Sequence, residues 1–433
     1  MKKKILFVTL LLAVTFSTFA GGILTNTNQH VSFLRMPARG ASISIDGVYS
    51  NPAGLGFMDD GLHLSFNWQS AYQKRIVDAS FALFDTDPKR YEGKASAPFI
   101  PSFQALYKMG DWAFSGSFAV TGGGGKASFD QGLAMFSAPV MAGLAAAGIN
   151  STMYDISSAM DGTQIIYGVQ LGASYRINEY FSAFLGGRMN YVSGGYQGYL
   201  NVNLKPEYVG AIPPEYLPKI ELDCEQTGWG VTPILSFHAK YNRWNLGLKY
   251  EFMTNLNIEN KTKANSDPEG ALKDYANGVN TPHDIPALLS AAIGCDILPT
   301  LRASFEYHMF FDKDAEMANN RQKHLDHNTN EYLAGIEWDA HKYVTLSGGI
   351  QFTDMGPTDD FQSDIAYSLD SYSIGLGAAI NITPKLTVNV AYFWTNYDDY
   401  TKTSTNYNNT TMPGTDVLSR TNKVFGLGVD YRF

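Results

Sequence analysis

The residues best suited to bind a metal or catalyse a reaction lie in two polar stretches late in the sequence. The first is His324-Leu325-Asp326-His327, and the second is an acidic run at residues 354–364. Imidazole and carboxylate groups ligate zinc or calcium, but neither stretch has the ligand spacing of a known metal motif. We interpret both as solvated loops. No serine, cysteine or carboxylate pair stands in a recognisable catalytic setting, so we expect no catalytic residue, metal, cofactor or enzymatic activity.

A different chemistry, the binding of apolar molecules, is suggested by the run LAMFSAPVMAGL at residues 133–144. It lies in the longest interval between predicted strands, residues 122–162, and Asp130 and Gln131 predict the start of one or two short helices in an extracellular loop. Such an apolar loop indicates a ligand-binding surface, or else a loop that packs on itself, and the two are compatible. The side chains that we expect to contact a ligand are Met135, Phe136, Val140, Met141 and Leu144.

The start of the chain has the layout of a secretory signal peptide, which we assign to residues 1–20. Three lysines precede an apolar run that is too short to span a membrane, and Thr18-Phe19-Ala20 offers a cleavage site. No cysteine stands at that site, which argues against a lipoprotein. Over the whole sequence 41 acidic residues outnumber 32 lysines and arginines, giving a formal net charge of −9, so nucleic acid is not an expected partner.

Most of the remaining chain alternates between apolar and polar residues with a period of two. In the last stretch Phe425, Leu427 and Val429 alternate with small or charged residues. A strand between lipid and an aqueous lumen requires this pattern, because neighbouring side chains point to opposite faces. Aromatic residues make up 13% of the chain and charged residues only 17%, less than in a typical soluble domain, which suits lipid contact. Cys224 and Cys295 fall at opposite ends of this topology, which argues against a disulfide.

The alternating stretches number fourteen, an even count that places both ends of the wall on one side. Their connections divide into tight turns and long polar loops, which is typical of the periplasmic and outer sides of bacterial barrels. We therefore predict an all-β, 14-stranded antiparallel transmembrane β-barrel of the bacterial outer membrane, with residues 61–433 as its wall. A soluble all-β protein, whose strands alternate because one face covers a core, is the alternative.

Residues 31–58, before the first strand, alternate poorly and contain prolines, which predicts a plug folded into the barrel lumen. The plug carries Arg35 and Arg39, and charge complementarity with the lumen wall would hold it in place. The lumen-facing carboxylates that we expect to pair with these arginines are Glu251, Glu306 and Glu337.

Within the plug, the run Ser50-Asn51-Pro52-Ala53-Gly54 resembles the hatch of the long-chain fatty acid transporter (FadL/TodX) family of outer-membrane barrels. The run stands about thirty residues after the cleavage site, where that family carries it. The resemblance implies an N-terminal hatch at residues 21–60, with Asn51, Pro52 and Ala53 as its motif. Proline at position 52 also restricts the backbone of both residues in the Asn51-Pro52 peptide and so stiffens the plug.

Four consecutive glycines, residues 122–125, follow the predicted third strand. Glycine within a strand weakens pairing and allows a kink or bulge. In the family that the chain resembles, a kink in the third strand opens the wall sideways, so the resemblance implies an exit into the membrane here. Ordinary loop flexibility is the interpretation that we prefer for these glycines, and the sideways exit is the alternative.

The resemblance implies passive uptake of hydrophobic small molecules, either long-chain fatty acids or aromatic hydrocarbons, across the outer membrane. The ligand would be captured at the apolar extracellular loops and released after the hatch rearranges, with Phe33, Leu34 and Met36 as plug contacts. Further expected partners are outer-membrane lipid and the outer-membrane assembly machinery, which reads a terminal aromatic residue such as Phe433. A structural or adhesive barrel that transports nothing, and a general porin, are the alternatives.

Overall fold

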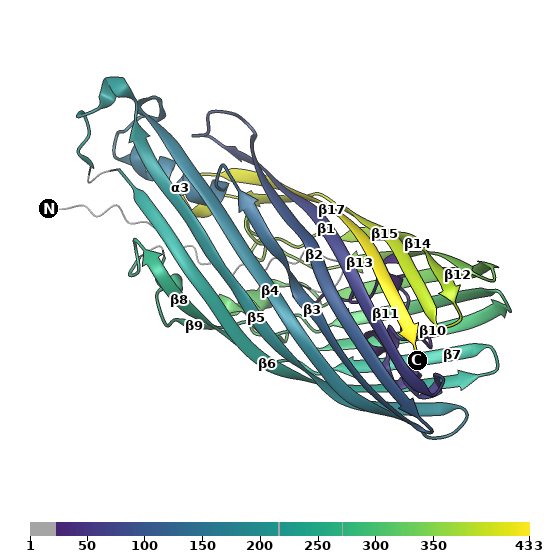
Figure 1. The fold of residues 1–433 in the computed structure, drawn as a ribbon. Helices are drawn as coiled ribbons and strands as arrows, with labels where there is room; N and C mark the ends of the chain where they lie inside the picture. Colours follow the sequence, from purple (N-terminus) through teal and green to yellow (C-terminus); the bar gives the residue numbers. More distant parts are fainter. Residues whose placement is uncertain (1–22, 215–216, 271) are drawn as a thin grey trace.

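A computed structural model describes residues 23–214, 217–270 and 272–433 of the chain. Within these ranges the strands form one antiparallel sheet, and the sheet closes into a barrel because the last strand pairs with the first (Figure 1). The wall has fourteen strands, so the predicted fold class is confirmed. The predicted signal peptide, residues 1–20, lies outside the described residues.

Seventeen strand segments make up the fourteen wall positions, because three wall strands are each interrupted. The continuous strands are β1 (Gly61–Phe81), β2 (Lys89–Met109), β3 (Trp112–Phe129), β4 (Tyr154–Arg176), β5 (Phe181–Leu204), β6 (Lys219–Tyr241), β11 (Leu301–Phe310), β12 (Thr329–His341), β13 (Val344–Asp354), β14 (Ser371–Thr383) and β17 (Gly414–Arg432). The interrupted strands are β7 (Trp244–Glu251) with β8 (Asn257–Asn265), β9 (Asn280–Pro282) with β10 (Leu288–Leu298), and β15 (Leu386–Tyr397) with β16 (Tyr400–Ser404).

The helices are short and few. The α-helices are α1 (Val31–Arg35), α2 (Gly47–Ser50) and α3 (Ala134–Ala146), and the 3-10 helices include η1 (Pro52–Phe57), η2 (Ser151–Met153), η3 (Pro206–Tyr208), η5 (Lys273–Tyr275), η6 (Ala318–His324) and η7 (Tyr407–Asn409). None of the helices in the described ranges is long and apolar enough to cross a membrane.

The two faces of the wall differ as the alternation predicts. On β17 the side chains of Phe425 and Leu427 are 52% and 42% exposed on the outer face, whereas Val424 between β1 and β15 is 1% exposed and points inward. Because large apolar side chains cover the outside of a closed sheet, the outer face suits hydrocarbon and not water. The soluble all-β alternative does not account for this surface.

The tight turns lie at the end of the barrel that also holds the C-terminus (Figure 1). Gly110 and Asn242 occupy two of these turns with φ angles of +59° and +52°, a region that glycine and asparagine enter most readily. Beside the first turn, the rings of Trp112 and Tyr175 lie 4.7 Å apart between centroids. Paired aromatics at strand ends are typical of the interfacial girdle of a membrane barrel.

The predicted loop at residues 122–162 is much shorter than expected, because β3 continues to Phe129 and β4 begins at Tyr154. The extra strand residues escaped prediction since both faces of a strand above the membrane contact water or protein, so hydropathy alternates weakly there. The loop holds one α-helix, α3, and the short helix η2. Asp130 and Gln131 do not cap α3, which begins after Leu133 instead.

An outward arginine near the middle of the wall should destabilise the barrel. Leu427 lies five residues from the end of β17, a rise of about 12 Å along a tilted strand, near the centre of the hydrocarbon layer. We expect Leu427→Arg to lower the free energy of unfolding in lipid vesicles, measured by urea titration, by about 2–4 kcal/mol. The matched control is Leu298→Arg at a periplasmic turn, where the cost should be about 0–1 kcal/mol. Equal costs at the two positions would contradict this placement of the bilayer.

Candidate functional site

The N-terminal segment at residues 23–58, hereafter the plug, is almost entirely buried within the ring of strands. Helix α1 packs against β13, β14, β15, β17 and β1, whereas η1 packs against β2, β3, β4, β5 and β6. A segment that contacts both sides of a closed ring lies across its interior. The hatch boundary at residues 21–60 and any movement of this segment stay predictions.

Inward-facing glycines let the plug backbone approach the wall closely. A Cβ atom added to Gly247 of β7 would lie 2.0 Å from the carbonyl oxygen of Gly40, and one added to Gly375 of β14 would lie 2.3 Å from that of Leu34. Real Cβ atoms do not approach this closely, so these positions require glycine. Similar close approaches to plug residues occur at Gly335, Gly349, Gly377 and Gly426.

A buried ion cluster joins the plug to β12. The Glu337 carboxylate lies 2.9 Å from an Arg35 guanidinium nitrogen and 3.2 Å from one of Arg39. Arg39 also binds Asp46 within the plug, at 2.7 Å. The predicted pairing of Glu337 with both arginines is therefore confirmed.

The other two predicted carboxylates do not pair with the plug arginines. Glu306 instead accepts a hydrogen bond from the backbone N–H of Gly40, at 2.8 Å. Glu251 pairs with the wall residues Arg188 and Lys249, so the prediction for it is wrong. Lys249 faces the same side two residues away, and its Nζ donates to the carbonyl of Tyr49 at 2.9 Å, so Glu251 reaches the plug only indirectly.

The Asn51-Pro52-Ala53 run is bonded to the wall opposite α1. Its backbone groups meet serine hydroxyls on three adjacent strands, so both peptide units flanking Ala53 are fixed, and the Asn51 side chain bonds within the plug. The hydrogen bonds are Ser174 Oγ to Pro52 O (2.6 Å), Ser182 Oγ to Ala53 O (2.5 Å), Ala53 N to Ser236 Oγ (2.9 Å) and Asn51 Nδ2 to Gly40 O (2.9 Å). The run therefore anchors the plug to β4, β5 and β6.

Phe33, Leu34 and Met36, the predicted plug contacts, pack against the wall. All three are buried, and Phe33 and Leu34 share a cluster with Leu333 and Phe393. The cavity that Phe33 borders has a volume of about 10 Å³, room for one water molecule and no larger ligand. A ligand role for these residues stays a prediction that requires the plug to move.

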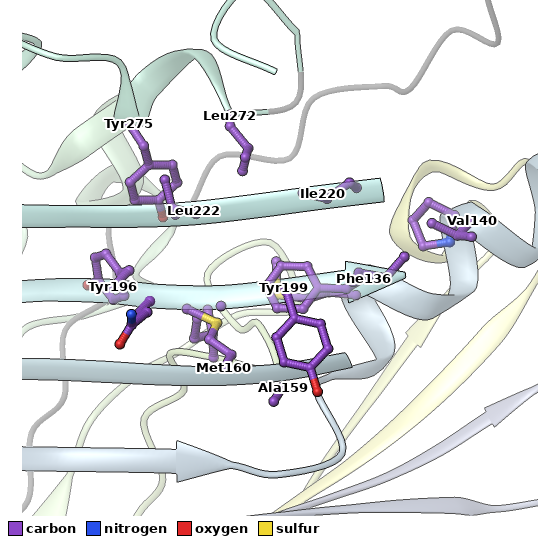
Figure 2. A pocket seen from close by; sticks show the side chains of 16 residues that line it. Phe136, Val140, Ala159, Met160, Tyr196, Tyr199, Ile220, Leu222, Leu272 and Tyr275 are labelled. Carbon is purple, nitrogen blue, oxygen red and sulfur yellow. The ribbon is translucent and has the colours of Figure 1, made fainter. Parts of the chain in front are cut away.

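An apolar cavity of about 120 Å³ lies under α3. Figure 2 shows Met160, Tyr196 and Leu222 on adjacent strands, with Phe136 and Val140 coming from the helix. None of the described lining residues is charged. The full lining is Met135, Phe136, Pro139, Val140, Ala159, Met160, Tyr196, Gln197, Gly198, Tyr199, Leu200, Ile220, Leu222, Leu272, Tyr275 and Ile365.

The structure brings three of the five predicted loop contacts, Met135, Phe136 and Val140, to this cavity. Met141 and Leu144 instead pack with Leu200 and other residues beside it, in the cluster that the self-packing interpretation expected. The lining residues of β4, β5 and β6 were missed. Their signal was an apolar inward face near the outer end of the strands, where a water-filled lumen would carry polar residues.

A loop between β13 and β14 holds α3 over the cavity. The Asp364 carboxylate, 2% exposed, accepts a hydrogen bond of 2.7 Å from the N–H of Met135 in the first turn of α3. Burial raises the pKa of this carboxyl group above its usual range. Ile365, the next residue, lines the cavity, so the loop both caps the helix and closes one side of the site.

The wall has a gap between β2 and β3, formed by residues 97–102 and 119–125. Pairing between these strands stops at Ser96 with Lys126 and resumes at Phe103 with Phe118. Pro98 and Pro101 on the β2 side cannot donate to a ladder, which explains the lost pairing.

The glycine run of β3 forms the other side of the wall gap. On the β4 side of β3 the register shifts at Gly122 and at Gly125, so the glycines lie in an irregular strand and not in a flexible loop. One apolar cluster includes Ala95 and Ala127 beside the gap together with Met135 and Met160 of the cavity. Apolar side chains therefore run from the cavity toward the gap.

The histidine and acidic stretches form no joint centre. His327 Nε2 lies 3.4 Å from Asp354, and His324 Nδ1 lies 3.9 Å from Asp360, as two separate exposed pairs. Across the described ranges no group of three or more histidine, cysteine or acidic residues is arranged to hold a metal ion. Cys224 and Cys295 are free thiols.

The barrel faces lipid on its outside, holds a plug in its lumen and has an apolar cavity near its outer mouth. These features together define the class of plugged outer-membrane barrels.

No protein-family profile and no curated protein matches the chain. Solved structures do match over nearly its full length. A Pseudomonas aeruginosa FadL homologue is 14% identical, covers 96% of this chain and 100% of its own, and superposes with a TM-score of 0.69.

Two toluene transporters superpose similarly. TbuX of Ralstonia pickettii is 14% identical to this chain and superposes with a TM-score of 0.59. The alignment covers 94% of this chain and 99% of TbuX. TodX of P. putida is 14% identical, with 90% and 94% covered and a TM-score of 0.57. The chain thus has the fold of the FadL-type barrels of the bacterial outer membrane, which is the fold that the hatch motif implied.

Removing the charge of Glu337 should loosen the plug. Glu337→Gln leaves two buried guanidinium groups without that carboxylate, and breaking a buried pair costs about 3–5 kcal/mol. We expect faster amide hydrogen exchange across residues 31–46 and faster tryptic cleavage after Arg35 and Arg39. Asp339→Asn, on the same strand but in a half-exposed pair with Arg302, is the control and should leave both rates unchanged. Unchanged plug protection in Glu337→Gln would refute the anchoring role.

A methyl group at Gly247 should displace the plug. The new Cβ would overlap the Gly40 carbonyl, and such overpacking costs about 1–3 kcal/mol. We expect Gly247→Ala to lower the thermal midpoint and to raise hydrogen exchange near residue 40. Gly187→Ala, whose Cβ would find an ordinary 3.4 Å contact, serves as the control. If both variants behave alike, the close approach is not a constraint.

Proposed function

We propose that the protein carries small neutral hydrophobic molecules passively across the outer membrane. The observation that supports this most is the cavity under α3, which is lined without a charged side chain and continues as an apolar cluster to the wall gap. Apolar molecules cross the polar outer sugar layer poorly, so a protein that binds them on an apolar surface speeds their entry.

The cavity favours aromatic hydrocarbons over long-chain fatty acids. Its volume of about 120 Å³ is close to the roughly 150 Å³ of an apolar protein cavity that takes up benzene. A carboxylate would lose its hydration there without a cation in the lining, which is costly. The names of two fold neighbours, toluene transporters, agree with this choice. A fatty acid could place only part of its chain in the cavity.

Capture at the cavity would be followed by a rearrangement of the plug and release of the ligand. The plug is held by the buried Glu337 cluster on one side and by the Asn51-Pro52-Ala53 run on the other. Breaking the buried cluster alone costs about 3–5 kcal/mol, so a local shift is favoured over expulsion of the whole plug. The wall gap offers a sideways exit into the membrane, since its two edges lack the ladder that seals the rest of the wall.

The alternatives fit less well. A general porin needs an open aqueous bore and would conduct ions steadily in a planar bilayer, whereas a plug buried across the lumen favours a gated path. An adhesive or structural barrel would lose partner binding, and keep uptake, when the α3 loop is deleted.

Outer-membrane lipid and the assembly machinery complete the proposed partners. Phe433 is 58% exposed at the chain end, and its ring meets that of Tyr431 at 4.7 Å. An accessible terminal aromatic pair is a suitable recognition element for insertion of the barrel.

A carboxylate placed in the cavity should abolish capture. We expect Phe136→Asp to lower uptake of radiolabelled toluene by cells at least about tenfold, because an unpaired charge in the apolar lining opposes entry of an apolar ligand. Val209→Asp, on an exposed loop and 72% accessible, is the control and should transport normally. Folding is checked by the heat-dependent gel mobility of the barrel. Normal uptake by a correctly folded Phe136→Asp protein would refute the proposed capture site.

A further inference from the structure

The outer face of the wall carries lysines on three neighbouring strands, β17, β1 and β2, which lie side by side in Figure 1. Lys423, Lys74 and Lys94, hereafter the lysine patch, are all exposed on this face. Lys74 and Lys94 stand directly opposite each other in the ladder, where like charges repel. Lys74 pairs with Glu92 at 3.2 Å, whereas Lys94 and Lys423 form no ion pair within the described residues. The patch therefore carries an excess of positive charge on a chain whose formal net charge is −9.

The lysine patch lies at the outer boundary of the hydrocarbon layer. Lys423 is nine residues from the end of β17, a rise of about 22 Å along a tilted strand, and the apolar band of such a barrel is about 25 Å tall. In the ladder Lys423 stands between Tyr72 of β1 and Trp394 of β15, and such aromatics are typical of a membrane interface. Because the end of β17 lies on the periplasmic side, the patch is level with the headgroups of the outer leaflet.

An apolar groove of about 710 Å³ adjoins the lysine patch on the lipid face of the wall. Its floor includes Gly426, Ala391 and Gly377, which are direct neighbours on β17, β15 and β14. The larger side chains of Tyr72 and Phe425, 49% and 52% exposed, stand beside this floor. None of the described lining residues is charged. Since Tyr72 is the ladder partner of a lysine of the patch, the groove and the patch form one continuous surface.

A lipid with a phosphorylated headgroup fits both features at once. Phosphate oxygens accept charge-assisted hydrogen bonds from lysine ammonium groups, and acyl chains of the same molecule can fill an apolar groove in the hydrocarbon layer. The outer leaflet of a bacterial outer membrane is built of glycolipids whose sugars bear phosphate. We infer that the lysine patch and the groove bind one phosphorylated glycolipid of the outer leaflet, with phosphate at the lysines and acyl chains along the groove. This site faces away from the lumen and is separate from the cavity under α3.

The spacing of the lysines favours a headgroup with two phosphates. Lys94 and Lys423 are two strands and two residues apart in the ladder, which separates their Cα atoms by about 12 Å. Two phosphates on adjacent sugars can therefore meet different lysines. A headgroup with a single phosphate would satisfy only one end of the patch.

Native mass spectrometry of the purified, detergent-solubilised protein measures the binding of lipid A, a disaccharide with two phosphates, and of its monophosphoryl form. We expect the wild type to bind lipid A at least about tenfold more tightly than zwitterionic dioleoylphosphatidylcholine. Lys94→Gln combined with Lys423→Gln removes two charges and leaves the pair of Lys74 with Glu92 intact. This double variant should bind lipid A at least about tenfold more weakly, and it should bind the two forms of lipid A equally.

The groove is tested separately from the charges. Ser70 lines the groove, so Ser70→Phe places a ring in it without altering the charge. We expect this variant to bind both forms of lipid A about threefold or more weakly, because the ring occupies the space of an acyl chain.

The controls are matched in chemistry. Lys342→Gln combined with Lys385→Gln makes the same change of charge at exposed positions in two periplasmic turns. Ala183→Phe adds a ring to the lipid face of β5, opposite the exposed Phe237. Both should bind lipid A like the wild type. Folding of every variant is checked by heat-dependent gel mobility.

Unchanged binding of lipid A by the lysine variant would overturn the inference, as would unchanged binding by Ser70→Phe. Equal binding of dioleoylphosphatidylglycerol and lipid A by the wild type would show that any lipid phosphate suffices, which would overturn the assignment to a glycolipid. A lipid-free dimer that Ser70→Phe dissociates would assign the groove to a second copy of the chain instead. None of these measurements involves transport, so their outcome does not depend on the proposed function.

Discussion

Every backbone polar group of a strand in a bilayer needs a partner within the protein, and the architecture follows from this requirement. The ladder closes between β1 and β17, so the wall has no free edge along most of its length. Where β2 and β3 part, the prolines of β2 remove donors, and groups of the plug bond to the carbonyls of β3. This break in the ladder is thus completed from inside, which ties the position of the plug to the integrity of the wall.

The plug is held by two kinds of contact that differ in strength and place. Close approach at wall glycines and a buried carboxylate, Glu337, fix the middle of the segment, and serine hydroxyls fix the Asn51-Pro52-Ala53 run. Neutral hydrogen bonds, together with the apolar packing of Leu24, hold the part that faces the wall gap. The ease of local movement therefore varies along the segment, and the weakest part lies beside the route that an apolar ligand would take.

The strands and their count were predictable from sequence, because lipid on one side and a polar lumen on the other impose strict alternation. The outer ends of β3 and β4 were not, since that contrast disappears above the membrane. The motif around Asn51 indicated the fold, but sequence could not tell which carboxylate meets the plug arginines. Glu251 and Glu337 both face the lumen, and the proximity of Arg188 and Lys249 decides that Glu251 is used elsewhere. Likewise, Asp364 caps α3 from a distant loop, a contact without a local signal.

The prolines at positions 98 and 101 also affect how the edge of β2 can interact with other polypeptides in the membrane. An exposed strand edge can pair with an extended segment of another polypeptide. Such pairing could join two barrels or cause a nascent polypeptide to misassemble. A strand edge that contains prolines lacks some of its backbone N–H donors. A segment of another polypeptide therefore cannot form a continuous ladder with it. The gap between β2 and β3 can therefore remain unpaired without pairing with other polypeptides.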